Sequence, residues 1–215
     1  MDVSNSQKSD WLEKVFTAKD PGELSDIYND WAEQYDEDVT HFGYSYKSPA
    51  VIAGFVGRYI SEKDGPILDA GAGTGLIGEM LALMGYSRLV ALDLSPGMLE
   101  VARKKNVYSD LRQMVLGEHL DFPDNTFETT VCAGTFTLGH APPQSLDELI
   151  RITKSGGFII FGIRCDGNNG DDFISMQENF EKEGKWQLAE QTEPFQSLPF
   201  AEPEAENLVF VYRVS

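Results

Sequence analysis

The sequence lacks the features that define several common protein classes. It has no run of the roughly 18 to 20 apolar residues that a membrane-spanning helix needs, and its first residues show no basic segment followed by an apolar one, as a secretion signal would. Only two of its 215 residues are cysteines, Cys132 and Cys165, too few for a disulfide framework. We therefore expect a soluble, cytoplasmic protein with two buried free thiols, and nuclear localisation is the alternative.

Positive charge is also scarce. The chain has 17 Lys and Arg against 35 Asp and Glu, a formal net charge of −18, and no basic cluster is longer than residues 103–105. Because nucleic acids are bound through cationic groups that displace counterions, this balance argues against a nucleic-acid partner. The three histidines are scattered without the spacing of metal ligands, so no metal site is expected.

The apolar pattern predicts an α/β fold. Hydrophobic residues make up 41% of the chain and charged residues 24%, as in an ordinary globular domain. Short apolar runs alternate with amphipathic segments whose helical faces recur every three to four residues. The predicted strands span residues 67–69, 89–92, 111–116, 129–133, 158–163, 186–192 and 207–214, and the helices between them 76–84, 96–105 and 145–152. This order predicts a Rossmann-like, doubly wound, seven-stranded sheet that is mostly parallel and ends in an antiparallel hairpin.

Two further segments complete the predicted organisation. Residues 1–47 are expected to form an N-terminal helical extension or lid, with a short, loosely docked helix around Trp11 and a longer amphipathic helix that carries Trp31 and Tyr35. Residues 48–215 are expected to form the main domain, which opens with a helix over 48–60. A turn-rich stretch over 166–172 precedes a helix that ends near residue 183.

The stretch with the most specific chemistry is residues 69–75, Asp-Ala-Gly-Ala-Gly-Thr-Gly, which begins where the first predicted strand ends. Alternating glycines permit positive φ and let the backbone approach a ligand with no Cβ between them. The helix that starts near Thr74 points its unpaired N–H groups at the same place. The stretch therefore predicts a pocket for a polar ligand, built from main chain.

Two classes of ligand fit this loop. The glycines at 73, 75 and 78 match the spacing of the dinucleotide fingerprint, and Asp93 lies at the distance expected for a ribose-binding acid. Asp69 favours the other class, because a carboxylate just before the turn would repel a pyrophosphate but suits a ligand that carries an ammonium or a sulfonium.

Asp93 ends the second predicted strand, and its two carboxylate oxygens can accept both hydroxyls of a ribose. The alternative is a cap for the helix that begins at Pro96, but Ser95 already occupies that position. Leu94 and Met98 follow as apolar walls for a base, although ordinary core packing explains Met98 nearly as well.

Residues 69–75 resemble the first motif of class I S-adenosylmethionine-dependent methyltransferases. Residues 149–160 resemble that family's helix, glycine turn and fifth strand, with Ser155 in place of the usual proline and with Gly156 and Gly157 expected at positive φ. The resemblance runs from about Tyr28 to the C-terminus. It implies S-adenosylmethionine as cofactor and S-adenosylhomocysteine as product. Segments 35–39 and 131–140 look most similar to the methyltransferase-like family of the Williams–Beuren chromosomal region.

The resemblance also implies which residues meet the cofactor. The glycine loop would pack against the methionine part of the cofactor. A residue after the third strand would meet the adenine, and Glu118 and His119 are open alternatives for this contact. The aromatic ring of Tyr35 would either close over the cofactor or belong to the core. The implied cofactor contacts are Tyr35, Asp69, Gly71, Ala72, Gly73, Gly75, Asp93, Leu94, Met98, Glu118, His119 and Gly134.

We therefore expect a methyltransferase that acts on a small-molecule acceptor. The alternatives are a methyltransferase of proteins, a cofactor-binding partner protein without activity of its own, and a nicotinamide dehydrogenase. Methyl transfer from a sulfonium needs alignment and exclusion of water, and it needs a base only where the acceptor must lose a proton. His140 is the candidate base, with an ordinary loop role as its alternative, and Tyr44, Tyr46 and Arg164 are weaker acceptor-side candidates.

Overall fold

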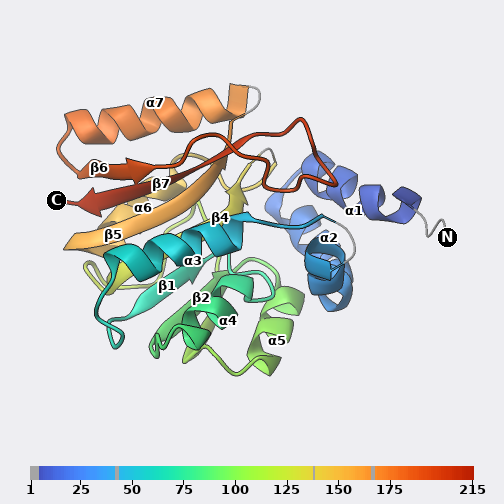
Figure 1. Ribbon diagram of the computed structural model, residues 1–215, viewed down its shortest axis with the longest axis horizontal. Coiled ribbons are helices and arrows are strands. Elements are labelled where there is room, and N and C mark those ends of the chain that lie inside the picture. The colour runs from blue at the N-terminus through green and yellow to red at the C-terminus, as the bar shows by residue number, and fades with distance from the viewer. Residues whose placement is uncertain (1–4, 42–43, 138, 166–167) are drawn as a thin grey trace.

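A computed structural model describes residues 5–41, 44–137, 139–165 and 168–215. Its core is one seven-stranded sheet with the order β3-β2-β1-β4-β5-β7-β6 (Figure 1). The strands are β1 (Ile67–Ala70), β2 (Leu89–Asp93), β3 (Asp110–Gln113), β4 (Phe127–Phe136), β5 (Thr153–Arg164), β6 (Trp186–Gln191) and β7 (Asn207–Val214). The first five are parallel, and β7 runs antiparallel to both β5 and β6. The predicted fold class is confirmed.

Helices cover both faces of the sheet. They are α1 (Asn5–Thr17), α2 (Pro21–Asp36), α3 (Ser48–Tyr59), α4 (Leu76–Leu83), α5 (Pro96–Lys104), α6 (Ser145–Ile152) and α7 (Asn168–Lys182), and a π-helical turn, η1 (Glu37–His41), follows α2. On one face, Ile52 of α3 and Leu81 of α4 belong to a buried core with β1, β2 and β4. On the other face, Leu146 of α6 and Phe173 of α7 belong to a second core. Because both faces are covered, β1 and β2 are mostly apolar, whereas the central strand β4 also buries Thr129 and Thr130.

Parallel pairing brings the carboxyl ends of the central strands to one edge of the sheet. Residue Asp69 of β1 lies between Ala91 of β2 and Val131 of β4. The residues that follow these strands therefore meet at that edge, which is where open α/β sheets bind ligands. None of the helices in the described part of the chain is long and apolar enough to cross a membrane.

Several predicted boundaries were wrong: the strands predicted over 129–133 and 158–163 are longer in the structure, and two further boundaries also differ. The third strand ends at Gln113 rather than 116: the Met114 N–H makes a last bond to the carbonyl of Asp93 in β2, and the chain then turns at Gly117 with φ +103°. Helix α7 already begins at Asn168, so most of the predicted turn over 166–172 is helical. Residues 166 and 167 of that turn lie outside the described residues.

The glycine turn before the fifth strand has a different form from the one expected. Strand β5 begins at Thr153, and its pairing with β4 jumps from Phe127↔Thr153 to Thr129↔Phe158, so residues 154–157 bulge. Gly156 has the expected positive φ of +79°, but Gly157 does not. Gly157 is instead required by close packing, because a Cβ there would lie 2.6 Å from the carbonyl oxygen of Glu128.

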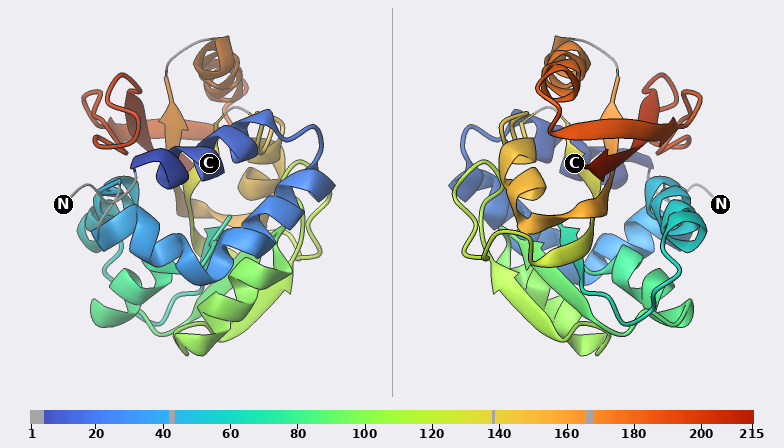
Figure 2. Two further views of the ribbon diagram at one scale, coloured as in Figure 1. Left: turned by 90° about the vertical axis from the view of Figure 1, so that its right-hand side faces the viewer. Right: turned by 90° about the vertical axis from the view of Figure 1, so that its left-hand side faces the viewer.

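The N-terminal helices lie across the carboxyl edge of the central strands, in front of the sheet in the left view of Figure 2. Trp31 of α2 is 1% exposed and stacks on Trp11 of α1, with ring centroids 5.7 Å apart. Val15 is also buried. Helix α1 is therefore packed into an aromatic cluster, and the expectation of loose docking was wrong.

Candidate functional site

A cavity of about 310 Å³ lies at this edge of the sheet. We call it the larger cavity; its volume is in the range of small-molecule sites. Many of the residues singled out in the sequence line it: Tyr35, Gly71, Gly73, Asp93, Leu94, Met98, Gly134 and His140. The other candidates are not among its lining residues: Asp69, Ala72, Gly75, Glu118 and His119.

The three glycines of the loop are needed for different reasons. All have positive φ, at +75° for Gly71, +55° for Gly73 and +89° for Gly75. A Cβ on Gly71 would lie 2.1 Å from the hydroxyl of Thr135, and one on Gly75 would lie 2.8 Å from the ring of Tyr108. A Cβ on Gly73 would meet nothing within 4 Å. Gly71 and Gly75 therefore make room for protein side chains, whereas Gly73 leaves its backbone open toward the larger cavity.

Asp93 anchors the same loop and faces the same cavity. One carboxylate oxygen accepts the Gly73 N–H at 2.8 Å, and the other accepts the Ser95 N–H at 2.9 Å. Burial raises the pKa of Asp93, and these backbone N–H groups partly offset the rise. Each carboxylate oxygen has a second lone pair. The carboxylate can therefore accept two further hydrogen bonds from a ligand.

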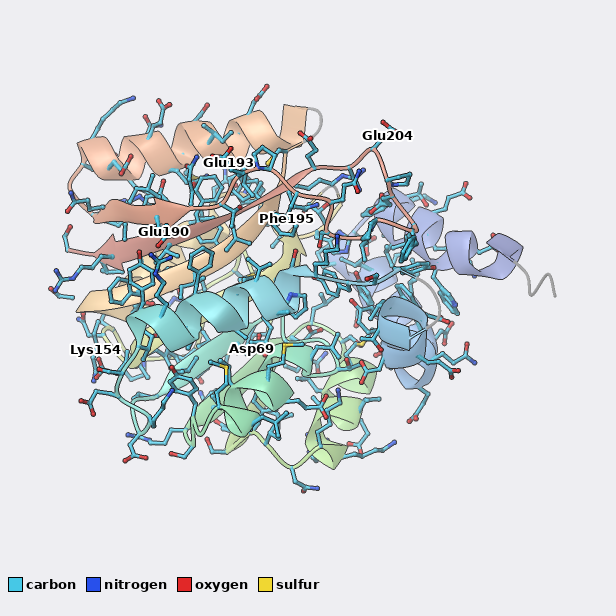
Figure 3. All side chains as sticks on the ribbon, in the orientation of Figure 1. Asp69, Lys154, Glu190, Glu193, Phe195 and Glu204 are labelled. Atoms are coloured by element: carbon cyan, nitrogen blue, oxygen red, sulfur yellow. The ribbon has the colours of Figure 1, made fainter. Side chains whose placement is uncertain are left out.

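Asp69 lies behind the loop rather than in the lining. It is 2% exposed at the end of β1, and Figure 3 labels it beneath α3, inside the molecule. One oxygen accepts the Tyr108 hydroxyl at 2.6 Å, and the other is buried without a hydrogen-bond partner. Burial raises the pKa of Asp69 to about 7, although the Tyr108 hydroxyl lowers it. The sequence predicts this carboxylate beside a cationic ligand, but Asp69 is not among the residues that line the larger cavity.

The raised pKa of Asp69 predicts a pH-dependent stability. The folded protein holds the Asp69 proton up to about pH 7, whereas an unfolded Asp loses it near pH 3.9. The stabilisation is therefore complete below about pH 4 and lost as the pH rises to 7, on the order of 2–4 kcal/mol for a single group. We expect Asp69→Asn to unfold like wild type at pH 4 and to be more stable at pH 8, as measured by urea denaturation. Equal stability of the two proteins at pH 8 would contradict the assignment.

Glu118 and His119 are both exposed and lie outside the larger cavity. The His119 side chain is 77% exposed and lies 3.1 Å from the Glu148 carboxylate. The positive φ of Gly117 turns the chain at this point, so the cavity is lined by the preceding residue, Leu116, together with Met114 and Val115. The sequence-based expectation that one of the two meets an adenine finds no geometric support here.

The contacts that fix α2 over the loop leave almost no signal in the sequence. Asp36 accepts a hydrogen bond from Thr74 of the glycine loop and pairs with Lys105 at 2.6 Å. Asn29 accepts from both the Ser95 hydroxyl and the Gly97 N–H at 2.8 Å. The only sequence signal was Asp36 in the Tyr35-Asp36 pair; nothing marked Asn29. These contacts hold α2 against the loops that follow β1 and β2.

A second cavity, of about 70 Å³, adjoins the first, and we call it the smaller cavity. Tyr28, Tyr35, Gly134 and His140 line both cavities. The Tyr28 hydroxyl lies 2.8 Å from Nε2 of His140, a contact that the sequence does not predict. Tyr44, Tyr46 and Arg164, the weaker acceptor-side candidates, line the smaller cavity only. Within the part of the chain that the structure describes, no group of His, Cys, Asp and Glu could hold a metal ion.

Comparison with known proteins agrees with this geometry. The family model described as "Methyltransferase domain" matches residues 68–161. Human Methyltransferase-like protein 27 is 31% identical over 170 residues, which cover 75% of this chain and 67% of that protein. Demethylmenaquinone methyltransferase of Renibacterium salmoninarum is 31% identical over 146 residues, covering 66% and 59%. The chain thus spans about three fifths of that enzyme.

Solved structures show the same fold at low identity. The [4+2]-cyclase SpnF superposes with a TM-score of 0.72 at 11% identity, covering 92% of this chain and 97% of that one. A TehB-like S-adenosylmethionine-dependent methyltransferase from Corynebacterium glutamicum superposes with a TM-score of 0.62 at 22% identity, covering 87% and 98%. The fold therefore carries more than one chemistry, and the local site has to identify the reaction.

Proposed function

The chain belongs to the class I S-adenosylmethionine-dependent methyltransferases, and from this membership we propose that it transfers a methyl group from that cofactor to a small-molecule acceptor. One observation carries the proposal. The open backbone of Gly73 and the carboxylate of Asp93 face one cavity, and that cavity meets a second one at Gly134 and His140. This arrangement suits a donor in the larger cavity and an acceptor in the smaller one.

The chemistry of the larger cavity fits the cofactor. Asp93 would accept the ribose hydroxyls, Leu94 and Met98 would flank the adenine, and the backbone at Gly73 would lie against the methionine part. Above about pH 7, where Asp69 is ionised, its buried, unpartnered oxygen would favour positive charge on the far side of the loop. When bound, the cofactor supplies a methyl group on a positively charged sulfur. The protein then has to align the acceptor and exclude water.

A small-molecule acceptor is favoured over a macromolecule. Helices α1 and α2 lie over the strand ends (Figure 2), and the cavities there, of about 310 and 70 Å³, have the volumes of small-molecule sites or less. The net charge of −18 disfavours a polyanion. The matching relatives include demethylmenaquinone methyltransferases and a malonyl-[acyl-carrier protein] O-methyltransferase from Yersinia pestis, which act on different acceptors. Their variety supports the reaction type without selecting one acceptor.

His140 is our candidate base for this reaction. It lines both cavities on the loop that follows β4, where a methyl group would leave the donor. An imidazole titrates near neutral pH, so it can take a proton from an acceptor without a large energetic cost.

The proposal is tested in two stages. Calorimetric titration should show binding of S-adenosylmethionine, whereas NAD should neither bind nor raise the melting temperature. A screen with radiolabelled methyl donor over small metabolites and over cell proteins then identifies the acceptor class. Cofactor binding with label only in proteins would favour the protein methyltransferase, and binding with no label and a co-purifying chain would favour the partner protein. Failure to bind the cofactor would contradict the proposal.

A further inference from the structure

The smaller cavity has a lining unlike that of the larger one. Its walls are mostly aromatic and aliphatic, with Leu12, Val15, Phe16, Trp31 and Val39 among them. They come from α1, α2 and the turn η1, and the loop between β6 and β7 closes the opposite side through Ser197 and Leu198. Figure 3 shows this loop, marked by Glu204, passing close to the N-terminal helices. A ligand here would be surrounded by side chains that are far apart in the sequence.

Charge within the smaller cavity is balanced. Among its described lining residues, the only fixed charges are Arg164 and Glu202, which pair with each other at 2.6 Å and have side chains 17% and 19% exposed. A carboxylate or ammonium ligand would therefore find no uncompensated counter-charge in these walls. Thr137 also lines the cavity, and its hydroxyl is buried without a hydrogen-bond partner. This lining suits a neutral ligand with an apolar body and at least one hydrogen-bonding group.

The junction between the cavities carries hydroxyl groups. The Tyr28 hydroxyl contacts Nε2 of His140 at 2.8 Å. The Tyr46 hydroxyl lies against Gly134, 2.2 Å from where a Cβ would be. The Tyr28 and Tyr46 hydroxyls would orient an acceptor that reacts through a hydroxyl, because each can donate a hydrogen bond to the acceptor hydroxyl and accept one from it.

We propose that the smaller cavity binds a neutral phenol or enol, whose hydroxyl is methylated at the junction with its proton passed through Tyr28 to His140. This inference rests on the proposed function, since it needs the methyl donor in the larger cavity. As the acceptor oxygen forms its bond to the methyl carbon, the carbon–sulfur bond breaks and its electron pair stays on sulfur. The acceptor proton moves to the Tyr28 oxygen, while the Tyr28 proton moves to Nε2 of His140. No other reactant is required.

The acidity of the acceptor decides the class. Tyr28 starts and ends this relay as a neutral phenol, so the net proton transfer is from the acceptor to the imidazole of His140, and a phenol or an enol gives up its proton far more readily than an alkyl alcohol. Burial raises the pKa of Tyr28 well above 10, so its hydroxyl stays protonated and can donate to Nε2 of His140 in the tautomer that leaves this nitrogen unprotonated. The volume of the smaller cavity, about 70 Å³, is below the roughly 150 Å³ that holds benzene. A single ring would therefore extend into the junction.

The test uses four small probes, p-cresol, p-toluidine, benzyl alcohol and p-toluate, each at millimolar concentration with radiolabelled methyl donor. We expect label in p-cresol at least tenfold above the other three. Label mainly in the amine, the alkyl alcohol or the acid would overturn the proposal, as would no label in any probe from protein that binds the cofactor. Protein that fails to bind the cofactor by calorimetry would instead contradict the proposed function.

Three variants separate the steps. Tyr28→Phe keeps the ring that stacks on Trp31, and we expect a fall of about 100-fold in kcat, as for the loss of a proton-transfer group, with unchanged affinity for S-adenosylhomocysteine.

Thr137→Val should raise the KM for p-cresol several-fold, and calorimetry with S-adenosylhomocysteine present should show the same loss of p-cresol affinity. Thr129→Val is the matched control, because its buried hydroxyl on β4 is equally unpartnered but lines neither cavity. Unchanged kcat in Tyr28→Phe, or equal effects of the two threonine variants, would overturn the assignment.

Discussion

Replacement of Gly73 by valine is expected to abolish detectable binding of S-adenosylmethionine. The valine side chain would project into space where a Cβ meets no protein atom within 4 Å, at the wall of the larger cavity. A ligand that packs against this backbone would then clash with the side chain, because a closely packed site cannot accommodate three added carbon atoms. We expect a loss of affinity of at least about 100-fold, which corresponds to about 2.7 kcal/mol, measured by calorimetry.

The control for this variant has to separate the clash from backbone strain. Gly73 has φ +55°, and a β-branched residue is strained at positive φ wherever it occurs. Gly184 has φ +70°, also has nothing within 4 Å of a Cβ, and lies in the turn before β6, outside both cavities. Gly184→Val should therefore lose a similar amount of stability but bind the cofactor like wild type. Equal affinity losses in the two variants would attribute the effect to strain and would place the cofactor elsewhere.

Replacement of Asp93 by alanine is expected to weaken cofactor binding about as strongly. The variant would lose the acceptor of the ribose hydroxyls, and it would also release the N–H groups of Gly73 and Ser95 that the carboxylate now holds. Hydrogen bonds to a charged group contribute about 1.5–3 kcal/mol each, so we expect a decrease in affinity of about 100-fold. Asp93→Asn keeps one acceptor oxygen and should show an intermediate loss. Both are measured by calorimetry with S-adenosylhomocysteine.

Asp110 provides the comparison for Asp93. It lies at the start of the neighbouring strand β3, away from the carboxyl edge, and it pairs with Arg112 at 2.7 Å near the surface. Asp110→Ala removes one negative charge from the same region of the sheet, but surface pairs contribute little to stability or binding. We expect its cofactor affinity to match wild type. If Asp93→Ala also bound normally, the ribose assignment would be wrong.

Titration with NAD distinguishes a methyltransferase from a nicotinamide dehydrogenase. A nicotinamide dinucleotide would place its pyrophosphate on the N–H groups at the start of α4, near the buried Asp69. Titration of Gly73→Val and wild type with NAD should therefore give the same absence of binding. Binding of NAD by either protein would instead favour the nicotinamide dehydrogenase that the spacing of the glycines also allows.

The sequence by itself determined the fold class and the glycine loop. Apolar runs at regular intervals mark strands because a parallel sheet covered on both faces excludes polar side chains from its centre. Alternating glycines after such a run mark a loop at positive φ because few other residues adopt that conformation. These are local properties of short segments. They predicted β1, β2, β4 and the position of Asp93 at a strand end, all of which the structure contains.

The tertiary structure decided which residues share the site. Nothing local distinguishes Gly73, open to the cavity, from Gly75, which accommodates Tyr108. The turn at Gly117 sends Glu118 and His119 to the surface, although they follow a predicted strand as the family pattern requires. Tyr28 meets His140 across 112 residues of sequence. That contact depends on how α2 packs across the sheet edge, and packing of distant segments leaves no periodic or compositional signal in a single chain.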